Sequence, residues 1–242
     1  MNKLIYLLWP RSPMEPARRR TVLLEQCAPT LLDSGARYLS MNIDDELATT
    51  PSPTPTTKLT DPFIAEVSIW VNDMSARGAL ESVLLDADFD IAGYRVREHI
   101  YTDYGGNEHG SPRDWPDGQR SPAVVSVTPL ERPRRISKDK WMKHWFNRQG
   151  PMSETMQPRA RYVRNVVEEV LTPGATPYEG IVEESWPSEK HVTNPYLFYG
   201  ASNRFELIKN MAIMAQSVAA FLPIWKITSV TTSEYFIRSP HA

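Results

Sequence analysis

The segment "YRVREHIY", Tyr94 to Tyr101, carries side chains suited to acid–base chemistry on an anion. Successive side chains of a strand point to opposite faces. One face of this segment and of its continuation to residue 103 therefore carries a run of polar groups: Arg95, Arg97, His99, Tyr101 and Asp103. In a cavity, Arg97 could neutralise a phenolate, carboxylate or enolate, His99 could move a proton, and Tyr101 could donate to a developing oxyanion. On the outside of an antiparallel sheet the same alternation describes a solvated face, and the sequence leaves both interpretations open.

A second segment, "SKDKWMKHWFNRQGP" from Ser137 to Pro151, is predicted as a helix that Ser137 caps and that ends at Gly-Pro. Trp141 and Trp145 lie four residues apart on one helical face, which predicts two core anchors. His144 lies beside that face. It either caps a carbonyl or faces solvent, or it acts as a base in a cleft between the helix and the sheet.

Four further side chains are candidates for contacts with a substrate in the same space: Tyr6, Trp145, Asn165 and Glu183. Tyr6 belongs to the first apolar run of the chain, and Glu183 belongs to the strand predicted after "YEG". Each of the four also fits an ordinary role as a hydrogen-bonded or packed residue of the core.

The elements that position these residues follow one order twice. In the first half, apolar runs and periodic segments predict strands at 3–9, 36–43, 63–71 and 91–101 and helices at 15–33 and 75–85. In the second half they predict strands at 123–130, 160–167, 178–186 and 225–232 and helices at 137–149 and 202–220. The Gly- and Pro-rich stretch between the halves is typical of a linker. The expected organisation is therefore 1–105, a linker at 106–120, and 121–242.

The repetition reaches individual residues. Ala36-Arg37-Tyr38-Leu39 recurs as Ala160-Arg161-Tyr162-Val163, and Cys27-Ala28-Pro29 has its counterpart in Gln149-Gly150-Pro151. We interpret this as an internal duplication of a βαββαβ, ferredoxin-like unit. One such unit covers only one sheet face with helices. The expected fold is α+β, with two ferredoxin-like repeats joining their bare faces in a pseudo-dimeric α+β barrel.

The segment Thr49 to Pro62, "TTPSPTPTTKLTDP", has no apolar periodicity and is predicted as a long surface loop. It is either a lid over the mouth of a cavity or a tolerated insertion.

The chain resembles the EthD-like family of the dimeric α+β barrel superfamily over nearly all of its length, with specific motifs mainly in residues 137–186. The residues that carry the resemblance are Ser137 to Pro151, "RYVRNVV" and "YEGIVEESW". They are similar to the family's helix ending in Trp-x-x-x-His-Gly/Ala-Pro, its Arg-Tyr-x-x-Asn strand and the strand that follows. At the position of the family's histidine this chain has Gln149, and the counterpart in the first half is Cys27. Gln149 can donate and accept hydrogen bonds but cannot shuttle a proton near neutral pH.

The resemblance implies a small, mostly apolar cavity and an enzyme. We expect a cofactor-independent, catabolic lyase that cleaves a C–C or C–O bond in a small aromatic molecule by decarboxylation, dehydration or aldehyde release. His99 or His144 would transfer the proton, and Arg97 and Tyr101 would stabilise the anion. One alternative is a cofactor-free monooxygenase or a cyclase or isomerase acting on an aromatic or polyketide-like substrate. Another is a non-catalytic ligand-binding accessory protein.

Several other classes of site are not indicated. The histidines have neither the spacing nor the Cys partners of a metal site, so we expect no metal and no cofactor. Because some members of the wider superfamily bind haem through one histidine, His99, His144 and His191 are the candidates for that role. There is no Gly-x-Gly-x-x-Gly, P-loop or Gly-x-Ser-x-Gly pattern.

Composition limits the partners and the compartment. The 242 residues have 41% hydrophobic content and a formal net charge of -2, so we expect neither nucleic acid nor a membrane as a partner. A single cysteine, Cys27, fits a reducing compartment, and the apolar run before Pro10 is too short to span a membrane. The expectation is a cytoplasmic protein, either a monomer or a homodimer.

Overall fold

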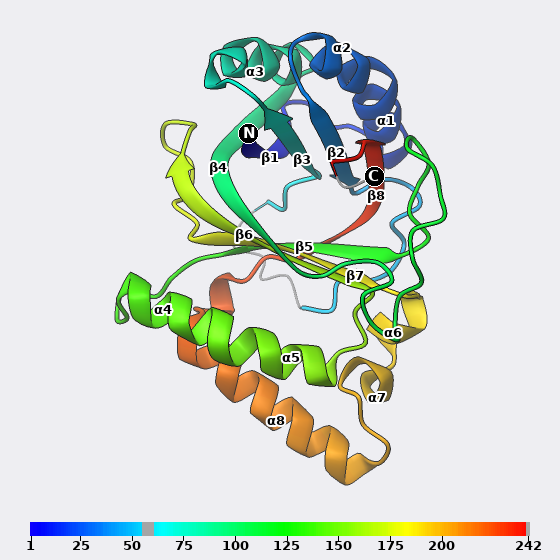
Figure 1. The fold of residues 1–242 in the computed structure, drawn as a ribbon, viewed down its shortest axis with the longest axis vertical. Helices are drawn as coiled ribbons and strands as arrows, with labels where there is room; N and C mark the ends of the chain where they lie inside the picture. The colour runs from blue at the N-terminus through cyan, green and yellow to red at the C-terminus, as the bar shows by residue number, and fades with distance from the viewer. Residues whose placement is uncertain (55–60, 241–242) are drawn as a thin grey trace.

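Eight antiparallel strands close into a barrel in the computed structural model, which describes residues 1–54 and 61–240 (Figure 1). The strands are β1 (Asn2–Pro10), β2 (Tyr38–Ile43), β3 (Ala65–Val71), β4 (Phe89–Thr102), β5 (Val124–Leu130), β6 (Arg161–Val170), β7 (Gly180–Trp186) and β8 (Val230–Arg238). Their order around the barrel is β1-β3-β2-β8-β5-β7-β6-β4. The pairs β2–β8 and β4–β6 join the two halves of the chain.

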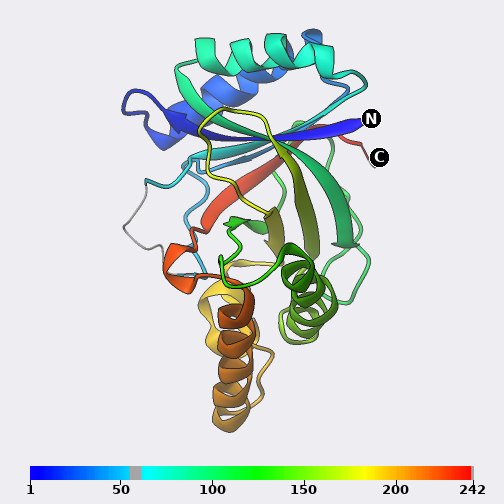
Figure 2. The same cartoon turned by 90° about the vertical axis from the view of Figure 1, so that its left-hand side faces the viewer.

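Helices cover the barrel on two opposite sides (Figures 1 and 2). Those of the first half are α1 (Pro16–Thr21), η1 (Val22–Cys27), α2 (Ala28–Asp33), η2 (Met74–Ala76) and α3 (Arg77–Asp86). Those of the second half are α4 (Lys138–His144), η3 (Trp145–Gln149), α5 (Gly150–Met156), α6 (Glu189–Thr193), α7 (Pro195–Phe198), α8 (Arg204–Phe221) and η4 (Ile224–Lys226). Figure 2 shows α8 extending away from the barrel.

The order of strands and main helices agrees with the sequence prediction in both halves. The arrangement β4-β1-β3-β2 of the first half has the same form as β8-β5-β7-β6 of the second. The differences are local: β8 begins at Val230 instead of Trp225, and the short helices α6 and α7 were not predicted. The duplication and the boundaries at residues 105 and 121 stay predictions. Residues 55–60 of the Thr49–Pro62 segment lie outside the described residues, so its role as a lid also stays a prediction.

The predicted helix end at Gly150-Pro151 is wrong, because α4, η3 and α5 follow one another without a break. The intervening η3 is a π-helix, in which the Gly150 N–H donates to the carbonyl of Trp145 five residues earlier. This wider turn accommodates Pro151, which has no N–H to donate. The first half uses the same device, since the π-helix η1 immediately precedes Ala28-Pro29.

Apolar side chains fill both helix–sheet layers and one end of the barrel. Trp141 and Trp145 are 0% and 1% exposed, which confirms their prediction as core anchors. Inside the barrel, one end is apolar, with Ile5, Leu7, Tyr94 and other apolar residues in contact. Polar side chains fill the other end.

A substitution at Gly180 can measure how tightly the helices and the sheet of the second half are packed. A Cβ at this position would lie 2.5 Å from the ring of Trp145, and a buried indole cannot move aside easily. We expect Gly180→Ala to lower the free energy of unfolding by about 1–3 kcal/mol. The control is Gly78→Ala in α3, where a Cβ meets nothing within 4 Å, and this change should stabilise by roughly 0.5–1 kcal/mol. Urea midpoints measure both, and equal midpoints for the two variants would contradict the packing argument.

Candidate functional site

A pocket of about 470 Å³ lies between the outer face of β5–β7–β6 and the helices of the second half. Its walls are mainly apolar and aromatic: Leu130, Trp145, Val182, Phe198, Met214 and Phe221. We call this hollow the helix–sheet pocket. Its volume is within the range of pockets that hold small organic ligands. Pro53 and Thr54, from the predicted surface loop, also line it.

Two polar side chains that are neighbours on adjacent strands face the helix–sheet pocket from the sheet. Tyr162 of β6 pairs with Glu184 of β7 in the strand register, so the two project from the same face. Arg159 is 1% exposed, forms an ion pair with Glu184, and stacks over the Tyr162 ring at 3.9 Å. Trp145 Nε1 lies 3.3 Å from the Tyr162 hydroxyl and donates to it. Burial raises the pKa of Tyr162, so the phenol keeps its proton.

Gln149 contributes a polar group from the helical side of the helix–sheet pocket. Its side-chain amide donates from Nε2 to Met214 Sδ at 3.3 Å, and its Oε1 is buried with no hydrogen-bond partner among the described residues. A buried acceptor without a partner costs free energy. A donor group on a bound molecule would therefore gain a full hydrogen bond at Gln149.

The face of β4 that carries Arg97, His99 and Tyr101 lies outside the barrel. Arg97 is paired with Glu168, and its side chain is 68% exposed. His99 meets Phe146 edge-on at 5.2 Å, and Tyr101 lies under Arg164 at 4.7 Å. The interpretation of this face as a cavity wall is wrong, because the opposite face fills the barrel with Tyr94, Val96 and Glu98. The proposed catalytic roles of Arg97, His99 and Tyr101 remain untested predictions.

The remaining predicted residues do not gather at one site. His144 Nε2 is 3.0 Å from the carbonyl of Ser217 and its ring stacks on Phe221, as the capping interpretation expects, and burial lowers its pKa. Tyr6 lies in the first helix–sheet layer, where its hydroxyl is 3.2 Å from Glu81. Trp145 lines the helix–sheet pocket, as above. Asn165 and Glu183 lie together inside the barrel.

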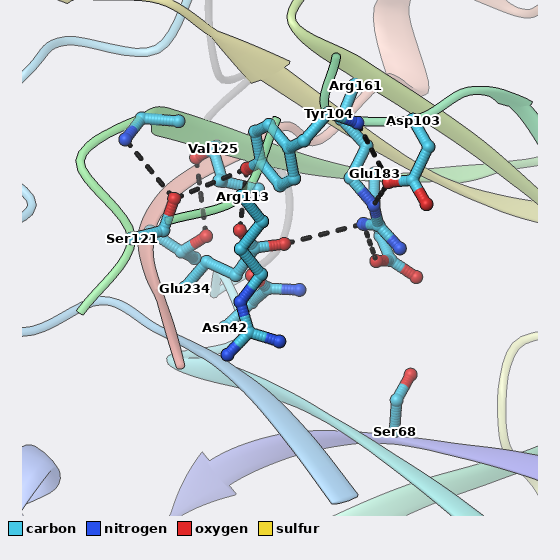
Figure 3. Close-up of polar contacts among 12 residues, drawn as sticks. Asn42, Ser68, Asp103, Tyr104, Arg113, Ser121, Val125, Arg161, Glu183 and Glu234 are labelled. Carbon is cyan, nitrogen blue, oxygen red and sulfur yellow. Dashed lines mark hydrogen bonds and ion pairs between the residues drawn. The ribbon is translucent and has the colours of Figure 1, made fainter. Parts of the chain in front are cut away.

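Asn165 and Glu183 belong to a polar network that sequence analysis did not find as a whole. Lys3 Nζ lies 2.7 Å from Glu98 and 3.2 Å from Glu183. Arg161 bridges Glu183 and Glu234 at 3.3 and 3.4 Å. Figure 3 shows Arg161 between these carboxylates, with Tyr104 and Ser121 near Glu234. These contacts join strands from both halves of the chain.

Glu66 is the most unusual member of this network. It is fully buried and accepts hydrogen bonds from Asn42 at 2.7 Å and Ser68 at 2.5 Å. Burial and the nearby charge of Glu183 raise the pKa of Glu66 to about 7. The charges of Lys3 and Arg161 outweigh the effect of burial on Glu183 and hold its pKa below the ordinary value. The only sequence signal was a single acid within the apolar run "FIAEVSIWV".

The described lining of the helix–sheet pocket offers no histidine that could hold haem iron. His99 and His144 have the neighbours given above, and His191 contacts Ser188 at 2.9 Å. The residues present therefore do not fit haem in this pocket. Among the described residues, no group of three or more His, Cys, Asp or Glu side chains is arranged to hold a metal ion. No helix in the described part of the chain is long and apolar enough to cross a membrane.

Solved structures with a similar fold are known. An anthrone oxidase-like protein matches with a TM-score of 0.60 and 10% identity, over 100% of this chain and 95% of that one. The chain therefore shares the overall fold of that protein, built here on a closed barrel of eight antiparallel strands. A dye-decolorizing peroxidase from Bacteroides thetaiotaomicron matches with a TM-score of 0.48 and 10% identity, over 98% and 92% of the two chains. A chlorite dismutase from Candidatus Nitrospira defluvii matches with a TM-score of 0.45 and 6% identity, over 98% and 92%.

No protein-family model matches the sequence, and no curated protein matches it. The resemblance to the EthD-like family therefore stays a prediction, while the barrel fold itself is shown.

The buried carboxyl of Glu66 predicts a pH-dependent stability. The pKa of Glu66 in the folded protein is about 7, above the ordinary 4.5. The protonated carboxyl therefore contributes its full stabilisation below about pH 4.5, and this stabilisation is lost as the pH rises through about 7. We expect Glu66→Gln to remove this loss and to be more stable than the parent at about pH 8, by on the order of 1 kcal/mol. Urea unfolding near pH 5.5 and pH 8 measures the effect.

The control for this prediction is Glu169→Gln, at a carboxyl on β6 whose side chain is 54% exposed. Its pH dependence should parallel that of the parent. If Glu66→Gln also followed the parent at both pH values, Glu66 would not hold the proton.

Proposed function

We propose that this chain is an enzyme that holds a small aromatic molecule in the helix–sheet pocket and catalyses proton transfer on it. The observation that carries the proposal is the pair Tyr162 and Glu184, which are neighbours on adjacent strands in the sheet wall of a mainly apolar pocket. Apolar pockets with a few convergent polar groups are the usual sites of small-molecule chemistry.

Each polar group has a role that follows from its contacts. Glu184 acts as the base and removes a proton beside a carbonyl, while Arg159 holds one oxygen of its carboxylate in place. Tyr162 accepts from the Trp145 indole, so its own O–H is directed to the substrate and stabilises the oxyanion that forms. Gln149 Oε1 accepts from a hydroxyl of the substrate, which fixes its orientation.

The reaction we favour is the elimination of an oxygen substituent from the carbon next to the enolate. The carbonyl re-forms, a C=C bond forms, the C–O bond breaks, and Glu184 returns its proton to the leaving oxygen, so this lyase reaction needs no bound cofactor. In this proposal Glu184 and Tyr162 move the proton in place of His99 and His144, because neither histidine lines the helix–sheet pocket. A substrate with a phenol or an enolisable ketone fused to an aromatic ring fits these groups.

A second candidate reaction is oxidation of the same enolate by molecular oxygen. The full-length match to an anthrone oxidase-like protein favours it, because an anthrone is an aromatic ketone whose enolate forms by the same proton abstraction. A third candidate is binding without turnover.

The polar groups of the proposed site, Gln149, Arg159, Tyr162 and Glu184, all come from the second half. Cys27 and Gln149 both stand two residues before a proline that follows a π-helix, and Leu31 and Ser153 both stand two residues after it. Cys27 and Leu31 are at most 1% exposed and pack in the core, whereas Gln149 and Ser153 line the helix–sheet pocket. We infer that the units 1–105 and 121–242 arose by duplication and that only the second keeps an open site.

Two substitutions test the assignment of the acid–base pair. With a turnover substrate found from a panel of phenolic, aryl-ketone and polyketide-like compounds, Glu184→Gln should lower kcat by about a hundredfold or more, since it removes the base. Tyr162→Phe should lower kcat by about tenfold or more through loss of the oxyanion donor. Steady-state kinetics measure both changes, with thermal unfolding as a check on folding.

Matched controls are Glu169→Gln and Tyr196→Phe, which alter the same residue types at exposed positions. Wild-type kcat is expected in both. Unchanged kcat in the Glu184→Gln and Tyr162→Phe variants would exclude this site as the place of chemistry.

Oxygen dependence separates the two reactions. The lyase should turn over at the same rate with and without oxygen, with a product lighter than the substrate in mass spectrometry. An oxidase should stop without oxygen and consume it in proportion to product. Ligand binding in the absence of any new product would support the binding protein.

A further inference from the structure

A large groove separate from the helix–sheet pocket lies at the end of the barrel opposite the polar network. Three connections form it: residues 131–135 after β5, 176–179 before β7, and 223–228 between α8 and β8. Its volume is about 1100 Å³, larger than most pockets for drug-sized ligands. We call it the basic groove because of its charges.

Four cationic side chains and two carboxylates line the basic groove: Arg132, Arg134, Arg135, Lys226, Glu131 and Glu179. Both carboxylates are already neutralised. Glu131 pairs with Lys226 at 2.7 Å, and Glu179 pairs with Arg132 at 2.8 Å. The charges of Arg134 and Arg135 therefore remain, on a chain whose formal net charge is -2.

Arg134 and Arg135 are available for an anion. Both are exposed, and Arg134 has no hydrogen-bond or ion-pair partner among the described residues. Arg135 uses one N–H, from Nη2, for the carbonyl of Ala219. A guanidinium carries five donors arranged to match two oxygens of a phosphate or carboxylate. Two adjacent arginines favour a ligand with more than one negative charge.

Trp225 supplies a flat apolar surface beside these charges. It is 59% exposed, although most tryptophans are largely buried. It lines the basic groove together with Tyr178. An exposed indole on the wall of a groove is suited to stack on a planar ring.

We propose that the basic groove binds a polyanion that carries a planar ring, the chemistry of a nucleoside polyphosphate. The phosphates lie on Arg134 and Arg135, and the ring stacks on Trp225. This site does not depend on the function proposed for the helix–sheet pocket, whose lining shares no residue with the basic groove.

The test uses three probes at low ionic strength: ATP, inorganic pyrophosphate and adenosine, with affinities measured by isothermal titration calorimetry. ATP should bind most tightly because it has both the ring and the charges. Arg134→Gln with Arg135→Gln should weaken ATP binding by about tenfold or more, since each removes a charge-assisted contact. Trp225→Ala should weaken ATP binding and leave pyrophosphate binding unchanged.

The matched control is the double variant Arg18→Gln with Arg204→Gln, which removes the same charge at exposed positions on α1 and α8. It should bind ATP like the parent. Lack of ATP binding by the parent would overturn the proposal, and so would an equal loss in both double variants, which would indicate only diffuse electrostatic attraction. Equal binding of ATP and pyrophosphate, unaffected by Trp225→Ala, would overturn the recognition of a ring.

Discussion

Because the barrel is closed, each charged side chain inside it needs a partner of opposite charge or a hydrogen bond. A closed sheet has an interior from which water is largely excluded, and an ionised side chain there is costly without partners. Lys3 and Arg161 meet four carboxylates in this interior: Glu66, Glu98, Glu183 and Glu234. Because the carboxylates outnumber the cations, protonation of Glu66 at a pH below its pKa of about 7 reduces the excess negative charge. The ion pairs also connect strands of both halves, so the network and the closure of the barrel depend on each other.

The filled interior leaves the helix-covered outer faces and the ends of the barrel as the places where ligand sites can form. In the first half that layer is filled, with Leu23, Cys27 and Leu31 fully packed against the sheet. In the second half a pocket remains between the helices and the sheet, and Gln149 and Ser153 border it together with aromatic side chains. Both halves contain a π-helix followed by a proline. The residues next to this proline pack in the core in the first half and line a pocket in the second half. π-helical turns are frequent at functional sites, because they redirect a side chain without ending the helix.

The connection between α8 and β8 separates the two hollows of the second half. Leu222, Ile224 and Ile227 face the helix–sheet pocket, whereas Pro223, Trp225 and Lys226 face the basic groove. One short segment therefore contributes an apolar wall on one side and an aromatic and basic wall on the other. The chemistry of the two hollows differs accordingly: the first suits a neutral aromatic molecule, the second a ring with negative charge.

Local sequence determined the order of the strands and main helices, the Ser137 cap and the buried tryptophans, because these depend on periodicity and on contacts a few residues apart. The tertiary structure decided which face of β4 is inside. Alternation showed two faces, but only the pairing of β4 with β1 and β6 put Glu98 inside and left His99 outside. It also decided that the helix continues through Gly150-Pro151, that Glu66 shares its surroundings with Glu183, and that Tyr162 stands opposite Glu184. Each of these results depends on residues distant in the chain, and no local pattern encodes their distance or their shared burial.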